Sequence, residues 1–376
     1  MSKNPAQQLH DYGQSVWYDN ISRELLDNGE IKRLIGEWGV RGMTSNPTIF
    51  DAAIGKSSLY DAQLKDLSDK QLSTSLLFEE LALQDIGRAA DLLRPIYESS
   101  EGEDGFVSIE VSPLLARDTE GTVKEAERLA QRLDRPNVMI KIPGTPEGMP
   151  AIRACLEKGL SINITLLFSV QNHVEVMNTY CEALRARVKR NEPVDKIRSV
   201  ASFFVSRVDT IVDAALEKIV KENKDPATVE RARALMGRFG IANCKLAYQK
   251  FQDIFMGQQF ADLRTAGAAV QRPLWASTST KNPNYRDTIY VEELIGPHTV
   301  NTMPHATLEA TVDHGKIAET LTKGVGEAER VRQELTDLGI DLDSLMLKLQ
   351  EEGVEKFVQS FEQLSTTLDE KVGKLK

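Results

Sequence analysis

Charged side chains stand at places in this sequence where a buried strand would normally carry apolar residues. The segment Val138–Pro143 (VMIKIP) holds Lys141 between two isoleucines, and Val107–Val111 (VSIEV) holds Glu110 near the end of an apolar run. Strands of a parallel sheet are covered on both faces and usually read as continuous apolar runs. Charged groups are rarely buried unless they are paired or functional. Lys141 and Glu110 are therefore the first candidates for chemistry.

Three further apolar segments carry polar groups in the same way. These groups are Asp19, Thr44, Asn46, Asn163 and Thr165. Because side chains alternate between the two faces of a strand, Asn163 and Thr165 share one face, and the isoleucines beside them lie on the other. In a barrel the polar face would meet the lumen and the apolar face would meet the surrounding helices. Five strands that supply polar groups to one barrel mouth are hard to explain by structure alone.

The groups that meet here are an amine, carboxylates, amides and hydroxyls, and no histidine stands on these five strand ends. A lysine amine that is desolvated in a barrel becomes a nucleophile toward carbonyl carbons. Neighbouring carboxylates can then move protons. The set predicts Schiff-base aldol chemistry, with Lys141 as nucleophile and with Glu110 and Asp19 as proton carriers. The structural alternative is an ion pair that involves Lys141 inside the barrel.

Two cations follow the sixth and seventh apolar segments. Arg207 comes directly after Ser202–Ser206 (SFFVS), and Lys281 comes directly after Trp275–Thr280 (WASTST). Barrel enzymes often hold a phosphate near their last strands, so both cations are predicted to bind phosphate with the help of adjacent hydroxyls. The structural alternatives are a solvent-exposed loop lysine for Lys281 and an ion pair with Asp209 for Arg207.

Short apolar runs alternate along the chain with longer helical patterns, which is typical of a parallel sheet wrapped by helices. The runs predicted as strands are Ser15–Asp19, Val40–Asn46, Phe106–Val111, Val138–Pro143, Ser161–Phe168, Ser199–Ser206, Pro273–Ser277 and Thr299–Met303. Eight strands with helices between them favour an α/β fold of the (β/α)8 TIM-barrel type, and an open doubly wound sheet is the alternative. A barrel keeps its active site at the carboxyl ends of its strands, where the polar groups stand.

Three helical regions exceed what a barrel needs. Leu76–Ile96 lies between the second and third strands, and a region from about Thr210 to Arg264 follows the sixth. Near the C-terminus one apolar stripe of a helix is formed by Val354, Phe357, Phe361, Leu364 and Leu368. We expect this helix to pack on the barrel, and a partner-binding helix is the alternative. Residues 1–376 are thus predicted to form one barrel domain, with 315–376 as a C-terminal helical extension.

Composition excludes several classes of function. The net charge of −10 argues against general nucleic-acid binding, and no basic run of the kind that binds anionic membranes is present. The three cysteines are widely spaced, which suggests reduced thiols and a cytoplasmic location. Neither a CxxC motif nor a helical pair of histidines occurs, so no metal site is expected. Neither a secretory leader nor a transmembrane helix is expected.

Six ordered motifs resemble the transaldolases over nearly the full chain. They are Thr44–Phe50 (TSNPTIF), Val107–Val111 (VSIEV), Ile140–Thr145 (IKIPGT), Asn163–Ser169 (NITLLFS), Ser202–Arg207 (SFFVSR) and Trp275–Lys281 (WASTSTK). The resemblance implies transfer of a dihydroxyacetone unit in the non-oxidative pentose phosphate pathway, without a cofactor. The donor would be sedoheptulose 7-phosphate or fructose 6-phosphate, and the acceptor glyceraldehyde 3-phosphate or erythrose 4-phosphate. The length and Trp17–Arg23 (WYDNISR) look like the longer bacterial subgroup.

The resemblance also implies a role for each residue of the site. Lys141 matches the Schiff-base lysine, and Glu110 matches a carboxylate that moves protons through a water held with Thr165. Asp19 matches the base that takes the proton of the substrate's C4 hydroxyl. Substrate contacts are implied for Thr44, Asn46, Asn163, Ser202, Phe204, Arg207 and Lys281. Of these, the phosphate would be held by Ser202, Arg207 and Lys281.

Two residues depart from the family pattern in the seventh-strand motif. Shorter members carry an arginine where Lys281 aligns, and Ser279 stands where the longer subgroup would have glycine. A lysine supplies the charge for a phosphate but lacks the bidentate fork of an arginine. The resemblance therefore predicts the phosphate charge at this position without its usual geometry.

Two alternative functions remain at this point. The nearest is a fructose-6-phosphate aldolase of the same superfamily, which releases free dihydroxyacetone. Those relatives are shorter and resemble this chain with glutamine in place of Glu110 and tyrosine in place of Phe204, so both residues favour transfer. The other is a non-catalytic sugar-phosphate-binding barrel in which Lys141 only pairs with Glu110. The oligomeric state stays open.

Overall fold

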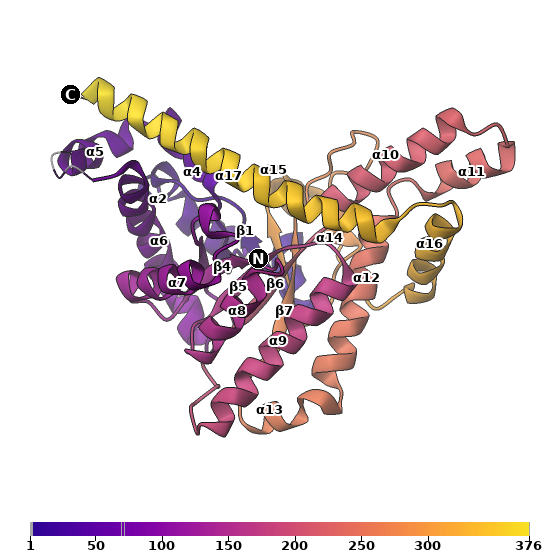
Figure 1. Cartoon of the computed structure of the whole chain (residues 1–376), viewed down its shortest axis with the longest axis horizontal. Helices are drawn as coiled ribbons and strands as arrows, with labels where there is room; N and C mark the ends of the chain where they lie inside the picture. Colours follow the sequence, from indigo (N-terminus) through magenta and orange to yellow (C-terminus); the bar gives the residue numbers. More distant parts are fainter. Residues whose placement is uncertain (1–2, 69, 71, 376) are drawn as a thin grey trace.

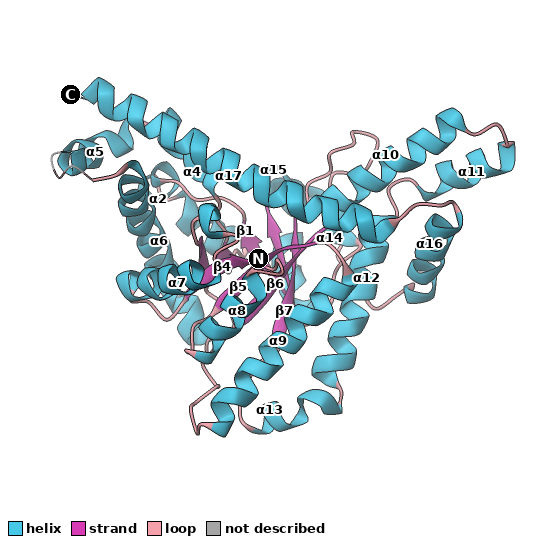
Figure 2. Ribbon diagram, in the orientation of Figure 1, coloured by secondary structure: helices cyan, strands magenta, loops and turns pink. Residues whose placement is uncertain are grey.

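Eight parallel strands close into one barrel in chain order. Figure 2 shows strands at the centre of the molecule with helices around them. The computed structural model describes residues 3–68, 70 and 72–375. The strands are β1 (Gln14–Tyr18), β2 (Gly42–Met43), β3 (Val107–Glu110), β4 (Val138–Pro143), β5 (Ile162–Leu167), β6 (Ser199–Phe204), β7 (Gln271–Ala276) and β8 (Thr299–Met303). Because β1 pairs with β8, the predicted closed barrel is confirmed and the open doubly wound sheet is wrong.

The strand boundaries differ from the predicted ones mainly at β2 and β7. β2 keeps only Gly42 and Met43, because Asn46 has already left the sheet to cap the helix that follows. Gly42 lies flat against the Trp17 indole, where any side chain would collide with the ring. β7 begins before the predicted Pro273, since the residues ahead of the proline already pair with β6. The predicted start of β7 at Pro273 is therefore two residues too late, because the strand begins at Gln271.

Side chains alternate across the barrel wall as the sequence predicts. On β4, Ile140 and Ile142 belong to the core between strands and helices, whereas Met139 belongs to a second core, one part of which fills the lumen. The lumen core also contains Trp17, Val200, Leu274 and Val300 from other strands. Apolar layers of this kind fill a barrel completely, so the polar side chains lie above them at the carboxyl ends of the strands.

Helices surround the barrel and connect its strands (Figure 1). In chain order they are α1 (Pro5–Gln8), α2 (Arg23–Asp27), α3 (Glu30–Arg33), α4 (Pro47–Lys56), α5 (Asp61–Ser68), α6 (Thr74–Ser99), α7 (Thr119–Leu133), α8 (Gly148–Glu157), α9 (Val170–Lys189), α10 (Ser206–Glu222), α11 (Pro226–Leu235), α12 (Phe239–Phe251), α13 (Ala261–Thr265), α14 (Ile289–Glu292), α15 (His305–His314), α16 (Val325–Asp337) and α17 (Leu342–Leu375). The extra helices predicted after the second and sixth strands are confirmed as α4 to α6 and α10 to α13.

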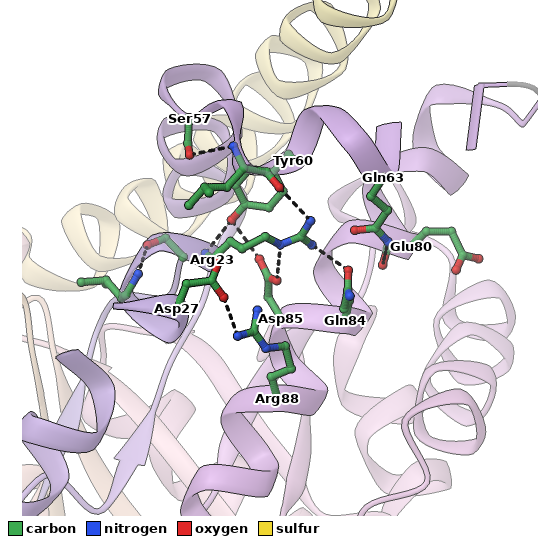
Figure 3. A network of polar contacts seen from close by, with 12 residues as sticks. Arg23, Asp27, Ser57, Tyr60, Gln63, Glu80, Gln84, Asp85 and Arg88 are labelled. Carbon is green, nitrogen blue, oxygen red and sulfur yellow. Dashed lines mark hydrogen bonds and ion pairs between the residues drawn. The ribbon is translucent and has the colours of Figure 1, made fainter. Parts of the chain in front are cut away.

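A buried polar network joins the first of these insertions to the chain that follows β1 (Figure 3). Arg23 on α2 forms an ion pair with Asp85 on α6, with 3.1 Å between Nε and Oδ1. The Tyr60 hydroxyl donates to the other Asp85 oxygen at 2.8 Å and accepts the Arg23 backbone N–H at 2.9 Å. Gln84 accepts from the Arg23 guanidinium at 2.9 Å. Because each buried charge has partners, its loss of hydration is compensated, and α2 is held in a defined place beside Asp19.

The 34-residue helix α17 crosses the barrel mouth and contacts α4, α6, α10 and β5 (Figure 1, yellow). Four residues of the predicted stripe are buried on it, namely Phe357, Phe361, Leu364 and Leu368. The helix has no proline and repeats leucine and phenylalanine on one face, which suits a long helix that packs along one side. The predicted apolar stripe is therefore confirmed as the buried face of a helix.

One end of α17 is fixed to the carboxyl end of β5. The Gln350 side chain donates to the backbone oxygens of Leu166 at 3.0 Å and of Gly144 at 3.1 Å. One turn further, a Cβ on Gly353 would lie only 2.9 Å from Leu166 Cδ2, so the two elements are in close contact. Leu166 has a left-handed backbone with φ of 60°, which costs an L-residue about 1–2 kcal/mol. These contacts set the position of Phe357 one turn later.

The His173 ring on α9 is completely buried against Phe203, with ring centroids 5.5 Å apart. Burial lowers the pKa of His173 from 6.5 to about 4. Between these pH values the unfolded chain binds a proton that the folded chain does not, so falling pH removes on the order of 3 kcal/mol of stability. We expect the melting temperature of His173→Phe to fall less than that of the wild type between pH 6.5 and pH 4.

Thermal melts across this pH range measure the effect. The exposed His314 provides the control, because its aspartate neighbours raise its pKa and its removal should not flatten the curve. Equal pH slopes for His173→Phe and the wild type would contradict the assignment.

Two further features concern the chain as a whole. No helix among the described residues is both long and apolar enough to cross a membrane. Cys155, Cys181 and Cys244 are buried free thiols, and burial raises the pKa of Cys155 and of Cys181 to about 12. Thiols of this kind pack as small apolar groups and do not act as nucleophiles at neutral pH.

Candidate active site

Most of the predicted site residues line one cavity at the carboxyl end of the barrel. The cavity has a volume of about 230 Å³. Nine of the predicted residues stand in its wall, namely Asp19, Thr44, Asn46, Lys141, Thr165, Ser202, Phe204, Arg207 and Lys281. The other two, Glu110 and Asn163, lie directly beside it and touch residues that line it. Residues far apart in the chain are thus brought to one place where a ligand fits.

Lys141 on β4 and Glu110 on β3 are paired directly by the strand register. Lys141 Nζ lies 3.3 Å from Glu110 Oε2, and the two side chains are only 8% and 5% exposed. The same amine donates to the backbone oxygen of Ser45 at 3.3 Å. The ion pair is loosely aligned, because neither Glu110 oxygen makes a well-oriented hydrogen bond within the described part of the chain. An amine held this way has weak partners and can turn toward an electrophile.

Burial raises the pKa of Glu110, and the Lys141 ammonium opposes that rise only in part. The raised pKa favours a protonated carboxyl group, which is the form that can donate a proton. Glu110 lines a second cavity of about 270 Å³, so its carboxyl group stands between this cavity and the amine. The Thr165 hydroxyl is also buried, and no described residue forms a hydrogen bond with it. Both groups therefore keep hydrogen-bonding capacity for a reacting molecule.

Asp19 follows β1 and receives a short series of hydroxyl groups. Thr44 Oγ1 donates to Asp19 Oδ1 at 2.6 Å, and Thr302 Oγ1 lies 2.7 Å from Thr44 Oγ1. Because the single Thr44 proton is used on Asp19, Thr302 must be the donor in the second contact. Burial raises the pKa of Asp19, while the Thr44 hydrogen bond and three cations around the cavity lower it. These opposing effects suit a carboxylate that accepts a proton and returns it.

The two predicted amides differ in their surroundings. Asn46 caps α4, with its Oδ1 accepting the Ile49 N–H at 3.0 Å, and this leaves the amide nitrogen to donate to a ligand. Asn163 is completely buried, donates to Ser108 Oγ at 2.9 Å and accepts from Ser202 Oγ at 2.7 Å. The structure therefore shows Asn163 holding Ser202 in place. The predicted contact of Asn163 with substrate would require one of these bonds to be exchanged.

Arg207 opens α10 and lies over the Phe204 ring, with 5.2 Å from Cζ to the ring centroid. Its alternative interpretation, an ion pair with Asp209, is wrong. The Asp209 carboxylate instead binds the Tyr290 hydroxyl at 2.7 Å and the Gly240 N–H at 2.5 Å. No carboxylate among the described residues lies within 4.0 Å of the Arg207 guanidinium, so the charge is available to an anion.

Lys281 lies in the irregular segment that follows β7. Its amine contacts Ser279 Oγ at 2.8 Å, and the side chain is exposed, as the structural alternative expected. It also lines the cavity that contains Lys141. Lys281 can be exposed and still line the cavity, because a phosphate bound at the mouth of a site remains partly in contact with solvent.

Six residues of the cavity wall were not among the predicted ones, and two of them stand close to the proposed catalytic groups. The Phe357 ring on α17 lies 5.5 Å from Lys141 Nζ, and Thr302 on β8 completes the hydroxyl series to Asp19. The apolar stripe did predict that Phe357 is buried, but a stripe does not say which surface covers it. For Thr302 the signal was a polar side chain at the end of the last strand, the same kind of signal that singled out Thr165.

Comparison with known proteins agrees with this geometry. The family model described as transaldolase/fructose-6-phosphate aldolase matches residues 16–368. The chain is 42% identical to a protein named transaldolase from Trichodesmium erythraeum (strain IMS101), over 100% of this chain and 99% of that protein. It is 46% identical to proteins of that name from Mycolicibacterium smegmatis and Thermobifida fusca, over 97% and 96% of this chain and 96% of each relative. The chain therefore belongs to the transaldolase/fructose-6-phosphate aldolase family.

Proposed function

We propose that the protein is a transaldolase that passes a dihydroxyacetone unit from a ketose phosphate to an aldose phosphate. The observation that carries this proposal is the buried Lys141 amine in the cavity wall, 3.3 Å from a carboxyl group whose pKa is raised. The donor is sedoheptulose 7-phosphate or fructose 6-phosphate, and the acceptor is glyceraldehyde 3-phosphate or erythrose 4-phosphate. This is a reaction of the non-oxidative pentose phosphate pathway, and the expected location is the cytoplasm.

The first half of the reaction forms the Schiff base. Lys141 gives its ammonium proton to the Glu110 carboxylate, and the freed amine attacks the ketose C2 carbonyl carbon. A carbon–nitrogen bond replaces the carbonyl π bond, and one amine proton passes to the oxygen to give a carbinolamine with a C2 hydroxyl. The protonated Glu110 carboxyl gives its proton to the departing C2 hydroxyl, which leaves as water, and an iminium remains. The Thr165 hydroxyl, buried near this pair, orients that water. The raised pKa of Glu110 suits the role, because it favours the protonated carboxyl group, which can act as the acid.

The second half breaks and remakes a carbon–carbon bond. Asp19 takes the proton of the C4 hydroxyl, the C3–C4 bond breaks, and its electrons move into the iminium to form an enamine. The aldose phosphate leaves, and an acceptor aldose phosphate takes its place. The enamine then attacks the acceptor aldehyde, Asp19 returns its proton, and water releases the new ketose. The water expelled in the first half is thus taken up again at the end.

The remaining cavity residues bind the sugar phosphate. Arg207 and Lys281 pair with the phosphate, whose negative charge neutralises both cations. Among the described residues Arg207 has no carboxylate partner, so its charge is available. Asn46 donates to a sugar hydroxyl beside the amine. Ser202 was predicted to contact the phosphate, but its hydroxyl proton is used on Asn163, so we assign it to a sugar hydroxyl, from which it accepts. Binding through groups remote from the reacting carbon keeps C2 within reach of Lys141.

Trapping with borohydride tests this function. The protein is incubated with fructose 6-phosphate and sodium borohydride, digested, and its peptides are weighed by mass spectrometry. We expect one reduced adduct, on the peptide that contains Lys141. The absence of that adduct would reject the Schiff-base mechanism. Rapid release of free dihydroxyacetone without an acceptor would instead identify a fructose-6-phosphate aldolase.

The Phe357 ring offers a test of how the enamine is retained. Phe357 is 7% exposed, and its ring faces the Lys141 nitrogen. We expect Phe357→Leu to reduce kcat/KM for transfer by roughly 2- to 5-fold, because a ring near a cation contributes about 0.5–1 kcal/mol. We also expect it to release more free dihydroxyacetone per transfer, since water reaches the enamine more easily.

Phe361 gives a matched control one turn along the same helix. It lines the neighbouring cavity and packs against Phe78 with ring centroids 5.9 Å apart. Phe361→Leu should lose comparable stability and keep the wild-type ratio of transfer to release. If both variants keep that ratio, the ring of Phe357 has no part in retention.

A further inference from the structure

Two aspartates one turn apart on α10 each bind a tyrosine from the segment that follows β7. Asp213 Oδ2 accepts from the Tyr285 hydroxyl at 2.6 Å, and Asp209 Oδ2 accepts from the Tyr290 hydroxyl at 2.7 Å. Hydrogen bonds from a hydroxyl to a carboxylate are short and strong compared with neutral ones. Two of them therefore join this segment to the side of α10.

The second oxygen of each carboxylate binds the chain at the start of α12, one just before the helix and one in its first turn. Asp213 Oδ1 accepts the Gly237 N–H at 2.8 Å, and Asp209 Oδ1 accepts the Gly240 N–H at 2.5 Å. A Cβ on Gly237 would lie 2.5 Å from the Tyr285 ring, so only glycine fits between the two segments. Each aspartate thus bridges two pieces of chain that are far apart in sequence, and we call the four side chains the aspartate–tyrosine bridge.

The same helix and the same segment carry the two proposed phosphate ligands. Arg207 stands in the first turn of α10, ahead of Asp209, and Lys281 stands four residues before Tyr285. Between β7 and α14 the chain forms no helix or strand. Backbone and side-chain hydrogen bonds of Ser277 and Thr278 hold its start, and the two tyrosines hold it beyond Lys281. Lys281 lines both the cavity that holds Lys141 and a neighbouring cavity that includes Tyr285 in its wall. The four bridge residues and the lysine thus line the same neighbouring cavity.

We propose that the aspartate–tyrosine bridge positions Lys281 relative to Arg207 and so sets the preference of the enzyme for phosphorylated over unphosphorylated substrates. These four side chains are positioning residues, because they act through Lys281 and do not line the Lys141 cavity themselves. The inference rests on the proposed function, which assigns the phosphate to Arg207 and Lys281. Beyond that function, the inference identifies the contacts that hold the exposed Lys281 in a fixed position for phosphate binding.

The physical reason is the cost of ordering. A lysine on a loose segment must be immobilised when phosphate binds, and that loss of freedom weakens binding. Because the bridge already joins the segment to α10, this conformational freedom is lost when the protein folds and not when phosphate binds. The chemistry at C2 lies at the other end of the sugar and does not depend on this join. The bridge should therefore act on KM for phosphorylated substrates and leave kcat nearly unchanged.

The test removes one hydroxyl. Tyr285→Phe keeps the ring against Gly237 and loses only the bond to Asp213. We expect KM for fructose 6-phosphate and the inhibition constant of inorganic phosphate to rise together by about tenfold, the scale of one charge-assisted hydrogen bond. Trapping of unphosphorylated dihydroxyacetone on Lys141 should proceed at the wild-type rate. Asp213→Asn, which retains one acceptor oxygen, should give a smaller rise.

Tyr180→Phe is the matched control, because its hydroxyl donates at 2.9 Å to the backbone oxygen of Ala269, away from the bridge. It should leave both constants unchanged. The inference is wrong if Tyr285→Phe leaves KM and phosphate inhibition unchanged, or if it slows trapping of dihydroxyacetone as much as it weakens phosphate binding. Failure of the proposed function looks different, since the wild-type protein itself would then form no adduct on Lys141.

Discussion

Replacing Lys141 with methionine should reduce transfer by roughly 10⁴-fold or more, the scale of losing one member of a covalent catalytic unit. Methionine fills a similar volume and carries no amine, so neither the carbinolamine nor the imine can form. The fold should survive, because Glu110 already has a raised pKa and protonates when its partner is removed. A coupled assay for transfer, with borohydride trapping and a thermal melt alongside, measures all three outcomes.

Lys141→Arg separates the nucleophile from the structural ion pair. Arginine keeps the positive charge opposite Glu110 but stays protonated in proteins and cannot attack a carbonyl. A residue that served only to pair with Glu110 would be replaced by arginine with little loss. We therefore expect Lys141→Arg to be as inactive as Lys141→Met. Appreciable transfer by Lys141→Arg would show that Lys141 serves only to pair with Glu110 and that the nucleophile is another residue.

Replacing Asp19 with asparagine should stop the reaction after the Schiff base has formed. Without a base for the C4 hydroxyl, cleavage of the C3–C4 bond should slow by about 10²–10⁴-fold, the usual contribution of one general base. Lys141 can still attack the carbonyl, so borohydride should trap the uncleaved six-carbon sugar, with its phosphate attached. The wild type, when the aldose phosphate is removed enzymatically, should give the three-carbon adduct instead.

Mass spectrometry of the Lys141 peptide distinguishes these adducts directly. Thr44→Val is a companion variant, because the Thr44 hydroxyl donates to Asp19 and holds its pKa down. Loss of that bond raises the pKa of Asp19, so the base becomes protonated at higher pH. The acidic limb of the kcat profile should then move to higher pH. A three-carbon adduct in Asp19→Asn, formed at the wild-type rate, would assign the base elsewhere.

The barrel and its family could both be predicted from the sequence because their signals are local. The alternation of polar and apolar residues along one strand, such as Asn163 and Thr165 with their apolar neighbours, indicates which face is polar. A parallel barrel then brings the polar faces of all its strands into one lumen. Six motifs in order then indicated the transaldolases, and the family match confirms that identification. The cavity residues at the strand ends could be predicted for the same reason, because the carboxyl ends of all barrel strands meet at one mouth.

Features that depend on contacts between distant segments could not be predicted in this way. β2 is short because Asn46 leaves the sheet to cap α4, and Gly42 packs against Trp17, a contact that no pattern within residues 40–46 contains. Phe357 was expected to be buried, but only the docked helix shows that it lies near Lys141. The partner of Asp209 was guessed from proximity in sequence, whereas Tyr290 lies 81 positions away. Long-range partners of this kind require the three-dimensional structure.

The place of α17 in the chain also has a consequence in time. Because this helix follows all eight strands, the ribosome completes the barrel first. At about 5–20 residues per second, synthesis of the 34 residues of α17 alone takes roughly 2–7 s, and the segment between β8 and α17 lengthens the interval. During that interval Lys141 lies in an open mouth, and any enamine formed there would meet bulk water. The growing chain therefore folds its barrel before α17 covers the site. Retention of the enamine, which transfer requires, becomes possible only once this last helix has been synthesised.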